Sequence, residues 1–251
     1  MNQTVLNRDD VLFRNQQLLA INKPAGVPVH GSKILEDQPR TLLTMVHELE
    51  GSPVHAIHRL DRPTSGVMLL TSSRLLLRKI SQAFEKRQIK KCYLAVARGW
   101  TEPRGTISHA LLPPKDDRKA HSVAREAVTR FEQIANVETP YAVPPYSTSR
   151  YTLLALYPET GRRHQLRRHM KHISHHLIGD TTYGRGEHNR LFRDEFDCHR
   201  LLLHAWALEF EDPEAGHLIR VQAPLDRAFG AIIKQFGWEN ALDSWAGSYR
   251  L

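Results

Sequence analysis

The sequence predicts a mixed α/β fold of the α+β class, and three observations support that class. Of the 251 residues, 41% are hydrophobic and 25% are charged, which is close to the average of globular proteins. Short strand-like runs bounded by Gly, Pro or charged residues dominate the first hundred residues. Segments with apolar residues at helical spacing lie between and after them. We therefore expect a single domain over residues 1–238 and a C-terminal tail over 239–251.

The elements follow in order along the chain. Strands are expected over 18–22, 54–59, 67–71, 92–97, 128–137 and 150–157. One helix is expected between the third and fourth strands, where Leu76, Ile80 and Phe84 share a face. Two more are expected over 162–173 and over 229–236, the last ending at Gly237. Residues 113–120 read as a loop. The Pro-rich connection over 139–149 is longer than a hairpin needs and is either a functional loop or a disordered flap.

Charge and composition favour some classes of function and exclude others. The formal net charge is +8, which favours a polyanionic partner such as nucleic acid, with simple solubility as the alternative. The longest apolar run has six residues, Cys92–Ala97, whereas a membrane span needs about 20. No export signal is visible, so we expect a cytoplasmic protein. Two cysteines form neither a disulfide framework nor a zinc ribbon.

The segment His58–Gly66, HRLDRPTSG, places one carboxylate between two arginines directly after an expected strand. Loops at strand ends often carry catalytic groups. Arg59 and Arg62 would help to keep Asp61 ionised, as a carboxylate nucleophile requires. The alternative is a structural Asp-x-Pro turn with surface ion pairs.

This segment resembles the HRLD-x-x-T-S-G signature of the RluA-type RNA pseudouridine synthase family. Five further elements resemble that family in the same order, and six ordered matches are far more specific than one. They are 22–26 (NKPAG), 91–95 (KCYLA), 160–167 (TGRRHQLR), 178–184 (IGDTTYG) and 200–205 (RLLLHA). Within the family, the chain is most similar to a branch that acts on tRNA at the uridine numbered 65. The features shared with that branch include the stretch Tyr146–Tyr151 and an insertion at 188–190.

The resemblance implies a long, mostly antiparallel central sheet flanked by helices and loops. It also implies an isomerase in which Asp61 is the nucleophile, with no metal or organic cofactor. Arg167 would be the ion partner of Asp61, and the helical wheel independently places Arg167 at the edge of the apolar stripe of 162–173. Tyr93 would stack on the target base, although a plain sheet residue is the alternative.

The target uridine must leave its stack before any side chain can reach it. By resemblance, Arg59 would fill the vacated position, since a guanidinium both stacks and pairs with phosphate. Further contacts with RNA phosphates are expected from other cations, with solvated surface charges as the alternative. These cations are Arg62, Lys90, Lys91, Arg162 and Arg168.

Eight of the 15 histidines fall between His164 and His204. On a helix, His164, His169 and His172 do not converge, so we expect no metal site, and a histidine-metal hydrolase is the weakest alternative. The leading function is tRNA pseudouridine synthase. The alternatives are a ribosomal RNA synthase of the same family and a noncatalytic basic RNA-binding module. We expect a monomer with tRNA as its partner, no membrane and no obligate protein partner.

Overall fold

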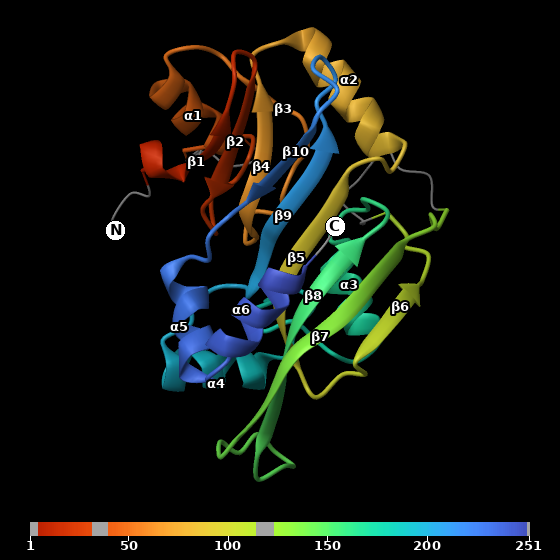
Figure 1. The fold of residues 1–251 in the computed structure, drawn as a ribbon. Coiled ribbons are helices and arrows are strands. Elements are labelled where there is room, and N and C mark those ends of the chain that lie inside the picture. The colour runs from red at the N-terminus through yellow and green to blue at the C-terminus, as the bar shows by residue number, and fades with distance from the viewer. Residues whose placement is uncertain (1–4, 32–39, 114–122, 250–251) are drawn as a thin grey trace. The chain divides into compact units, whose positions relative to one another are not determined.

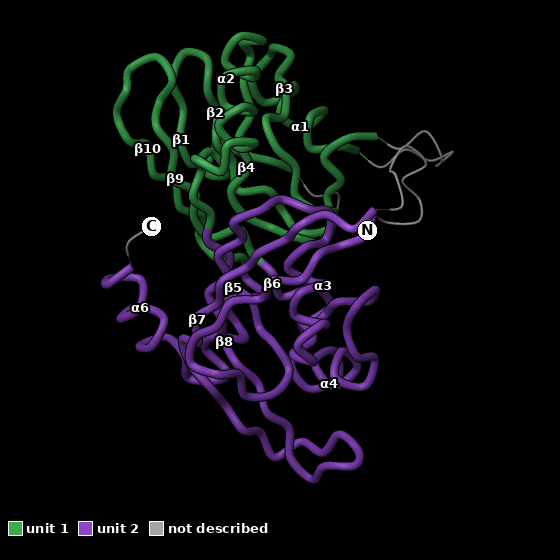
Figure 2. The backbone as a smooth tube through the Cα atoms, turned by 90° about the vertical axis from the view of Figure 1, so that its right-hand side faces the viewer, with its two compact units in different colours: residues 1–91, 204–226 green, residues 92–203, 227–251 purple. Residues whose placement is uncertain are grey.

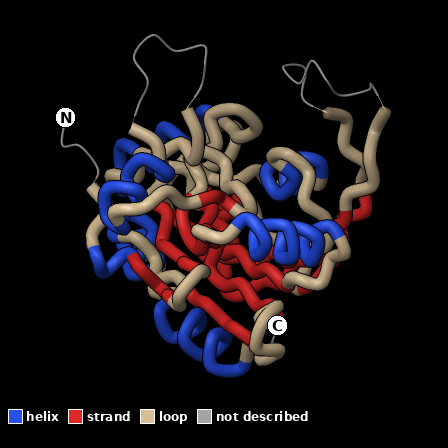
Figure 3. The backbone as a smooth tube through the Cα atoms, turned by 90° about the horizontal axis from the view of Figure 1, so that it is seen from above, coloured by secondary structure: helices blue, strands red, loops and turns tan. Residues whose placement is uncertain are grey.

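The structure is a computed structural model that describes residues 5–31, 40–113 and 123–249. The chain divides into two compact units, each built from two separate stretches of sequence (Figure 2). The first unit comprises residues 1–91 and 204–226, and the second comprises 92–203 and 227–251. The described residues contain both strands and helices, as the mixed α/β class requires (Figure 3).

The first unit is a sheet whose strands follow the order β1-β2-β4-β9, with β3 paired to β4 and β10 paired to β9 (Figure 1). β4 and β9 run parallel, and the other pairs are antiparallel. The strands are β1 (Val11–Arg14), β2 (Leu18–Lys23), β3 (His55–Ala56), β4 (Ser65–Thr71), β9 (Leu203–Glu211) and β10 (Leu218–Gln222). Its helices are the short 3₁₀ helix Arg8–Asp10, α1 (Leu42–Glu50) and α2 (Arg74–Glu85).

Helix α2 closes the core of this unit. Ser73 caps its N-terminus, because the side chain accepts a hydrogen bond from the Leu76 backbone N–H. Leu76 and Ile80 are buried and pack in one cluster with Leu69 of β4 and Leu208 of β9. Each such side chain contributes about 1.5–3 kcal/mol through burial.

The second unit is an antiparallel sheet in the order β5-β8-β7-β6. Its strands are β5 (Lys90–Arg98), β6 (Arg104–Ser108), β7 (Val128–Thr139) and β8 (Ser149–Pro158). Its helices are α3 (Gln165–His172), α4 (Gly186–Phe196), α5 (Arg227–Gln235) and α6 (Glu239–Ser248). Leu166 and Met170 of α3 are buried against Leu154 and Leu156 of β8, and Ile173 packs at the edge of that cluster. The predicted apolar stripe is therefore confirmed.

The mixed α/β class with mostly antiparallel strands is confirmed. Two boundaries were wrong. The strand expected over 54–59 is only His55–Ala56, because the chain turns away toward a tight turn in which the Thr64 N–H donates to the Asp61 carbonyl. The helix expected from 162 begins at Gln165, because His164 adopts left-handed backbone angles with φ 56°. Arg162 and Arg163 thus lie before the helix, and the helical wheel does not apply to them.

The structure bears on the expected C-terminal tail and on the expected loop over 113–120. The segment named as a tail is helix α6 over Glu239–Ser248, and the Trp245 indole N–H donates to Glu132 Oε2 at 3.4 Å. The loop expected over 113–120 lies outside the described residues from position 114 onward. In the described part of the chain, no helix is both long and apolar enough to cross a membrane.

Candidate active site

Asp61 lies in the tight turn between β3 and β4. The Thr64 backbone N–H donates to the Asp61 carbonyl oxygen at 3.0 Å, which closes the turn Asp-Arg-Pro-Thr. The Asp61 side chain is partly exposed, and the neighbouring Arg59 and Arg62 are exposed. The turn therefore fixes the backbone of the carboxylate residue while leaving its side chain open to solvent.

A buried lysine fastens this turn to the loop after β2. The ammonium group of Lys23 is fully buried and donates to the carbonyl oxygens of Pro24 and Val27 at 2.8 Å and of Arg62 at 3.2 Å. These three acceptors offset the large cost of burying a charge. Arg62 and Gly26 bond in both directions, since Arg62 Nε donates to the Gly26 carbonyl at 2.9 Å and the Gly26 N–H to the Arg62 carbonyl at 2.8 Å.

His58, the first residue of the signature, positions the segment on β4. Its Nε2 accepts the Leu69 backbone N–H at 3.0 Å, and its ring packs on Phe84 of α2 at 4.9 Å between centroids. Burial, with a contribution from the charge of Lys91, lowers the pKa of His58 to about 4. The ring is therefore neutral at physiological pH, and it serves as a hydrogen-bond acceptor.

The other end of the signature binds β9. Ser65 Oγ lies 2.7 Å from His204 Nδ1, and His204 Nε2 lies 3.2 Å from the carbonyl oxygen of Ala223. Because a carbonyl only accepts, Nε2 carries the ring proton and Nδ1 accepts from Ser65. Gly66 has φ 110°, and a Cβ there would lie 2.2 Å from the Ala205 carbonyl oxygen. Only glycine allows this close parallel pairing.

In the second unit, Tyr93 lies on β5 opposite Leu156 of β8. Its side chain is partly buried and packs against the apolar cluster of this unit. The ring is thus held on a strand that pairs with β8 from Tyr93 to Arg98. Stacking on a base stays a prediction.

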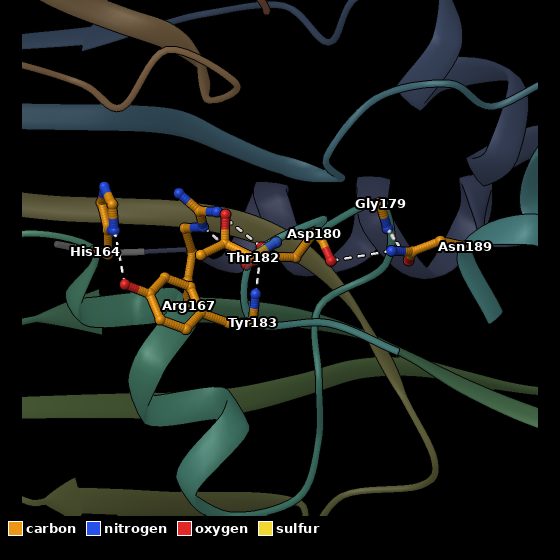
Figure 4. Close-up of polar contacts among 7 residues, drawn as sticks. All are labelled: His164, Arg167, Gly179, Asp180, Thr182, Tyr183 and Asn189. Atoms are coloured by element: carbon orange, nitrogen blue, oxygen red, sulfur yellow. Dashed lines mark hydrogen bonds and ion pairs between the residues drawn. The ribbon is translucent and has the colours of Figure 1, made fainter. Parts of the chain in front are cut away.

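Arg167 is held by a carboxylate 13 residues along the chain (Figure 4). Its Nε donates to Asp180 Oδ2 at 2.8 Å and its Nη2 to Oδ1 at 2.7 Å, and the two side chains are only 5% and 1% exposed. The Tyr183 ring lies 5.1 Å from the guanidinium carbon, and its hydroxyl lies 2.9 Å from His164 Nδ1. The guanidinium is therefore fixed both in its plane and on one face.

The loop around Asp180 is built to hold this charge. Oδ1 accepts backbone N–H groups of Thr182 and Tyr183, each at 2.9 Å. Asn189 of α4 bridges the loop, donating to the Asp180 carbonyl at 2.9 Å and accepting the Gly179 N–H at 2.8 Å. Burial raises the pKa of Asp180, but the hydrogen bonds from Arg167 and the backbone outweigh it, and the pKa is below its usual value. The carboxylate is ionised.

Asp180 and Asn189 belong to the sequence motifs, but the sequence alone predicted no role for either residue. A carboxylate near a buried arginine is a signal that could have identified Asp180, since a half-buried guanidinium needs an anion. Gln165 was likewise quoted without a role. Its Oε1 accepts from Thr160 Oγ1 at 2.7 Å, and its Nε2 donates to the Val128 carbonyl at 3.0 Å, which fixes the start of α3 against β7. The pairing of Arg167 with Asp61 stays a prediction.

The cations expected to contact RNA have varied surroundings. Lys90 forms an ion pair with Glu209 at 3.0 Å, and burial, with the charge of Arg87, lowers the pKa of Lys91 to about 8. Arg162 Nε donates to the Glu126 carbonyl at 3.0 Å. Arg168 Nη1 donates to the Leu112 carbonyl at 2.8 Å. Their contacts with RNA, and that of Arg59, stay predictions.

The described residues contain no cluster of three His, Cys, Asp or Glu side chains that could hold a metal ion. His169 is instead fully buried, with Nδ1 at 3.0 Å from Thr129 Oγ1. His188 is buried too, with Nδ1 at 2.9 Å from the Tyr151 hydroxyl. These two histidines pack and form hydrogen bonds within the second unit.

Comparisons with known proteins identify the family of this chain. A family described as RNA pseudouridylate synthase matches residues 17–172. A Haemophilus ducreyi protein named tRNA pseudouridine synthase C is 43% identical over 91% of this chain and 96% of its own length. A Pectobacterium carotovorum protein of the same name is 40% identical over 95% of this chain, which spans 65% of that protein.

The solved structure of human RNA pseudouridylate synthase domain containing 4 is similar with a TM-score of 0.68 and 25% identity, over 91% of this chain and 93% of that one. The likeness extends over both units, and the family match covers every motif from the loop after β2 to α3. The chain belongs to the RNA pseudouridylate synthase family.

Proposed function

We propose that this protein isomerises a specific uridine of tRNA to pseudouridine, at the position conventionally numbered 65. The observation that carries the proposal is the close likeness, over nine-tenths of the chain or more, to proteins named tRNA pseudouridine synthase C. The net charge of +8 supports a polyanionic substrate. We propose a monomeric, cytoplasmic enzyme.

In this proposal, Asp61 is the nucleophile. Uridine must be detached at N1, turned and rejoined through C5, and a carboxylate can hold the ribose or the base during that exchange. Attack at C1′, attack at C6 and assisted elimination to a glycal each use the same group. The turn anchored by Lys23 supports this role, because a nucleophile on a fixed backbone loses little freedom when substrate binds.

Other residues are assigned by their environment. We propose that Tyr93, partly buried on β5, stacks on the flipped base, and that Arg167 supplies a fixed positive charge. Arg59, exposed two residues before Asp61, is proposed to fill the vacated stack. The reaction is proposed to need neither metal nor organic cofactor, so it should survive exhaustive chelation, with any magnesium effect traced to the RNA fold.

The experiment that tests the proposal compares Asp61→Asn with Asp197→Asn. Asp197 is 97% exposed and pairs with His199, so it controls for the loss of a carboxylate alone. We expect Asp61→Asn to abolish conversion and to keep affinity for tRNA within about threefold, because an amide keeps the shape but is no nucleophile. Asp197→Asn should retain full activity. Near-normal turnover by Asp61→Asn would refute the nucleophile.

Pseudouridine should also be mapped in tRNA and ribosomal RNA from cells with and without the protein. Loss of one tRNA pseudouridine supports the proposal. Loss of pseudouridine confined to ribosomal RNA would show that ribosomal RNA, and not tRNA, is the substrate. No loss of pseudouridine in either RNA, with RNA binding intact, would favour a noncatalytic binding module.

A further inference from the structure

Two exposed histidines of the second unit are stacked face to face. His109 follows β6 and His172 is the last residue of α3. Their ring centroids are 3.7 Å apart, and the planes differ by 14°. Both residues are exposed, whereas His169, edge-on to His109, is fully buried. A parallel pair of imidazoles on the surface is an unusual use of two titratable groups.

The stack is held in place by contacts from α3 to the backbone after β6. His169 Nε2 lies 3.0 Å from the His109 carbonyl and so donates its proton there. Its Nδ1 accordingly accepts from Thr129 Oγ1 at 3.0 Å. Arg168 Nη1 donates to the Leu112 carbonyl at 2.8 Å. The backbone that carries His109 is therefore held against α3, the helix that carries His172.

The same contacts gather cationic groups. Among the described residues, Arg168 and His169, both on α3, are the charged and titratable groups that interact with the stacked pair. Burial first, and then the charges of His172 and Arg168, lower the pKa of His109. Among the residues that the structure describes, no Asp or Glu forms an ion pair with any of these four groups. An external anion would offset the positive charges that lower the pKa of His109.

We propose that His109, His172 and Arg168 form a binding site for a backbone phosphate of the RNA substrate. The proposal rests on the proposed function for its ligand, RNA. The charge complementarity favours a phosphate, and Arg168 retains donors beyond the one given to Leu112. A bound phosphate would favour the protonated form of His109, so RNA affinity should rise as the pH falls.

The test is binding of unmodified tRNA transcript to the double variant His109→Gln/His172→Gln at pH 7.5 and pH 6.0, across a range of salt concentrations. We expect about threefold to tenfold weaker binding than the parent at pH 6.0 and a smaller difference at pH 7.5. The slope of log affinity against log salt should fall by about one phosphate contact. The matched control is His199→Gln, an exposed histidine of the same unit, which should bind like the parent.

Two further arms separate the explanations. The double variant His109→Phe/His172→Phe keeps two planar rings without charge. Weak binding by this variant supports phosphate recognition, and parental binding would overturn it in favour of base stacking. Parental affinity and salt slope in the Gln variant, with an unchanged melting temperature, would overturn any role in RNA binding. Conversion by the parent protein tests the proposed function separately, so the two failures are distinguishable.

Discussion

Replacing Asp180 should reveal how much the buried charge pair contributes to stability. Asp180→Asn removes one charge from a pair whose side chains are 5% and 1% exposed. It leaves the buried Arg167 guanidinium facing an amide oxygen in place of the carboxylate. Breaking a buried pair from one side costs about 3–5 kcal/mol, because the remaining charge stays out of water without its partner. We expect a loss of that size in the free energy of unfolding.

The same chain offers a matched exposed pair. Arg150 Nε donates to Glu138 Oε2 at 3.1 Å, at the end of the β7–β8 hairpin, with side chains 53% and 34% exposed. Exposed pairs contribute about 0–1 kcal/mol, so Glu138→Gln should change little. Burial, rather than the presence of an ion pair, then accounts for the contrast between the two variants.

Urea unfolding followed by circular dichroism measures both variants against the parent. The double variant Asp180→Asn/Arg167→Met should recover part of the loss, since it also removes the buried charge that Asp180 had balanced. A loss below about 1 kcal/mol for Asp180→Asn would refute the reasoning, as would equal losses for Asp180→Asn and Glu138→Gln.

Three other outcomes follow from the structure. Gly66→Ala should lower the free energy of unfolding by more than about 2 kcal/mol, because its Cβ would lie 2.2 Å from the Ala205 carbonyl oxygen. Gly230→Ala, in open space within α5, should raise the free energy of unfolding by about 0.5–1 kcal/mol. Similar melting temperatures for the two variants would contradict this expectation. Burial lowers the pKa of His188 to about 4, so between pH 6.5 and 4 the folded protein binds fewer protons at this residue than the unfolded chain. The free energy of unfolding should therefore fall as the pH drops through that window, by at most about 3 kcal/mol from this group. A free energy of unfolding that is constant from pH 7 to 5 would argue against this role of His188. Arg59→Ala should slow single-turnover conversion more on a paired target uridine than on an unpaired one, and equal slowing would remove its stack-filling role.

Elements with a regular apolar period were predictable from the sequence. The strands β2, β4, β5, β7 and β8 and the helices α2, α3 and α5 lie close to their expected positions. Helix α4 was missed, because its buried face includes polar residues. His188 bonds to Tyr151 and Asn189 bonds to the Asp180 loop, so hydrogen bonds with residues far along the chain make this face suitable for burial. Hydrophobic periodicity carries no signal of that kind.

The site shows the same division. Motif resemblance picked out Asp61 and Arg167, but the buried state of Lys23 could not be inferred, since a lysine is ordinarily exposed. Its burial depends on three carbonyl oxygens, one of which belongs to Arg62, 39 residues away. The carboxylate that binds Arg167 was within the quoted motifs, yet no local pattern connects positions 167 and 180.

Four of the nine residues of the HRLDRPTSG signature hold the chain in place. His58 binds β4, Arg62 binds the loop after β2, Ser65 binds His204, and Gly66 permits the approach of β9. Asp61 differs, since its backbone closes the turn while its carboxylate is the single acidic group of the segment and is partly exposed. We propose that these neighbours preorganise one partly exposed carboxylate for nucleophilic catalysis. In that proposal, the surrounding residues of the signature determine stability and the Asp61 carboxylate determines the reaction.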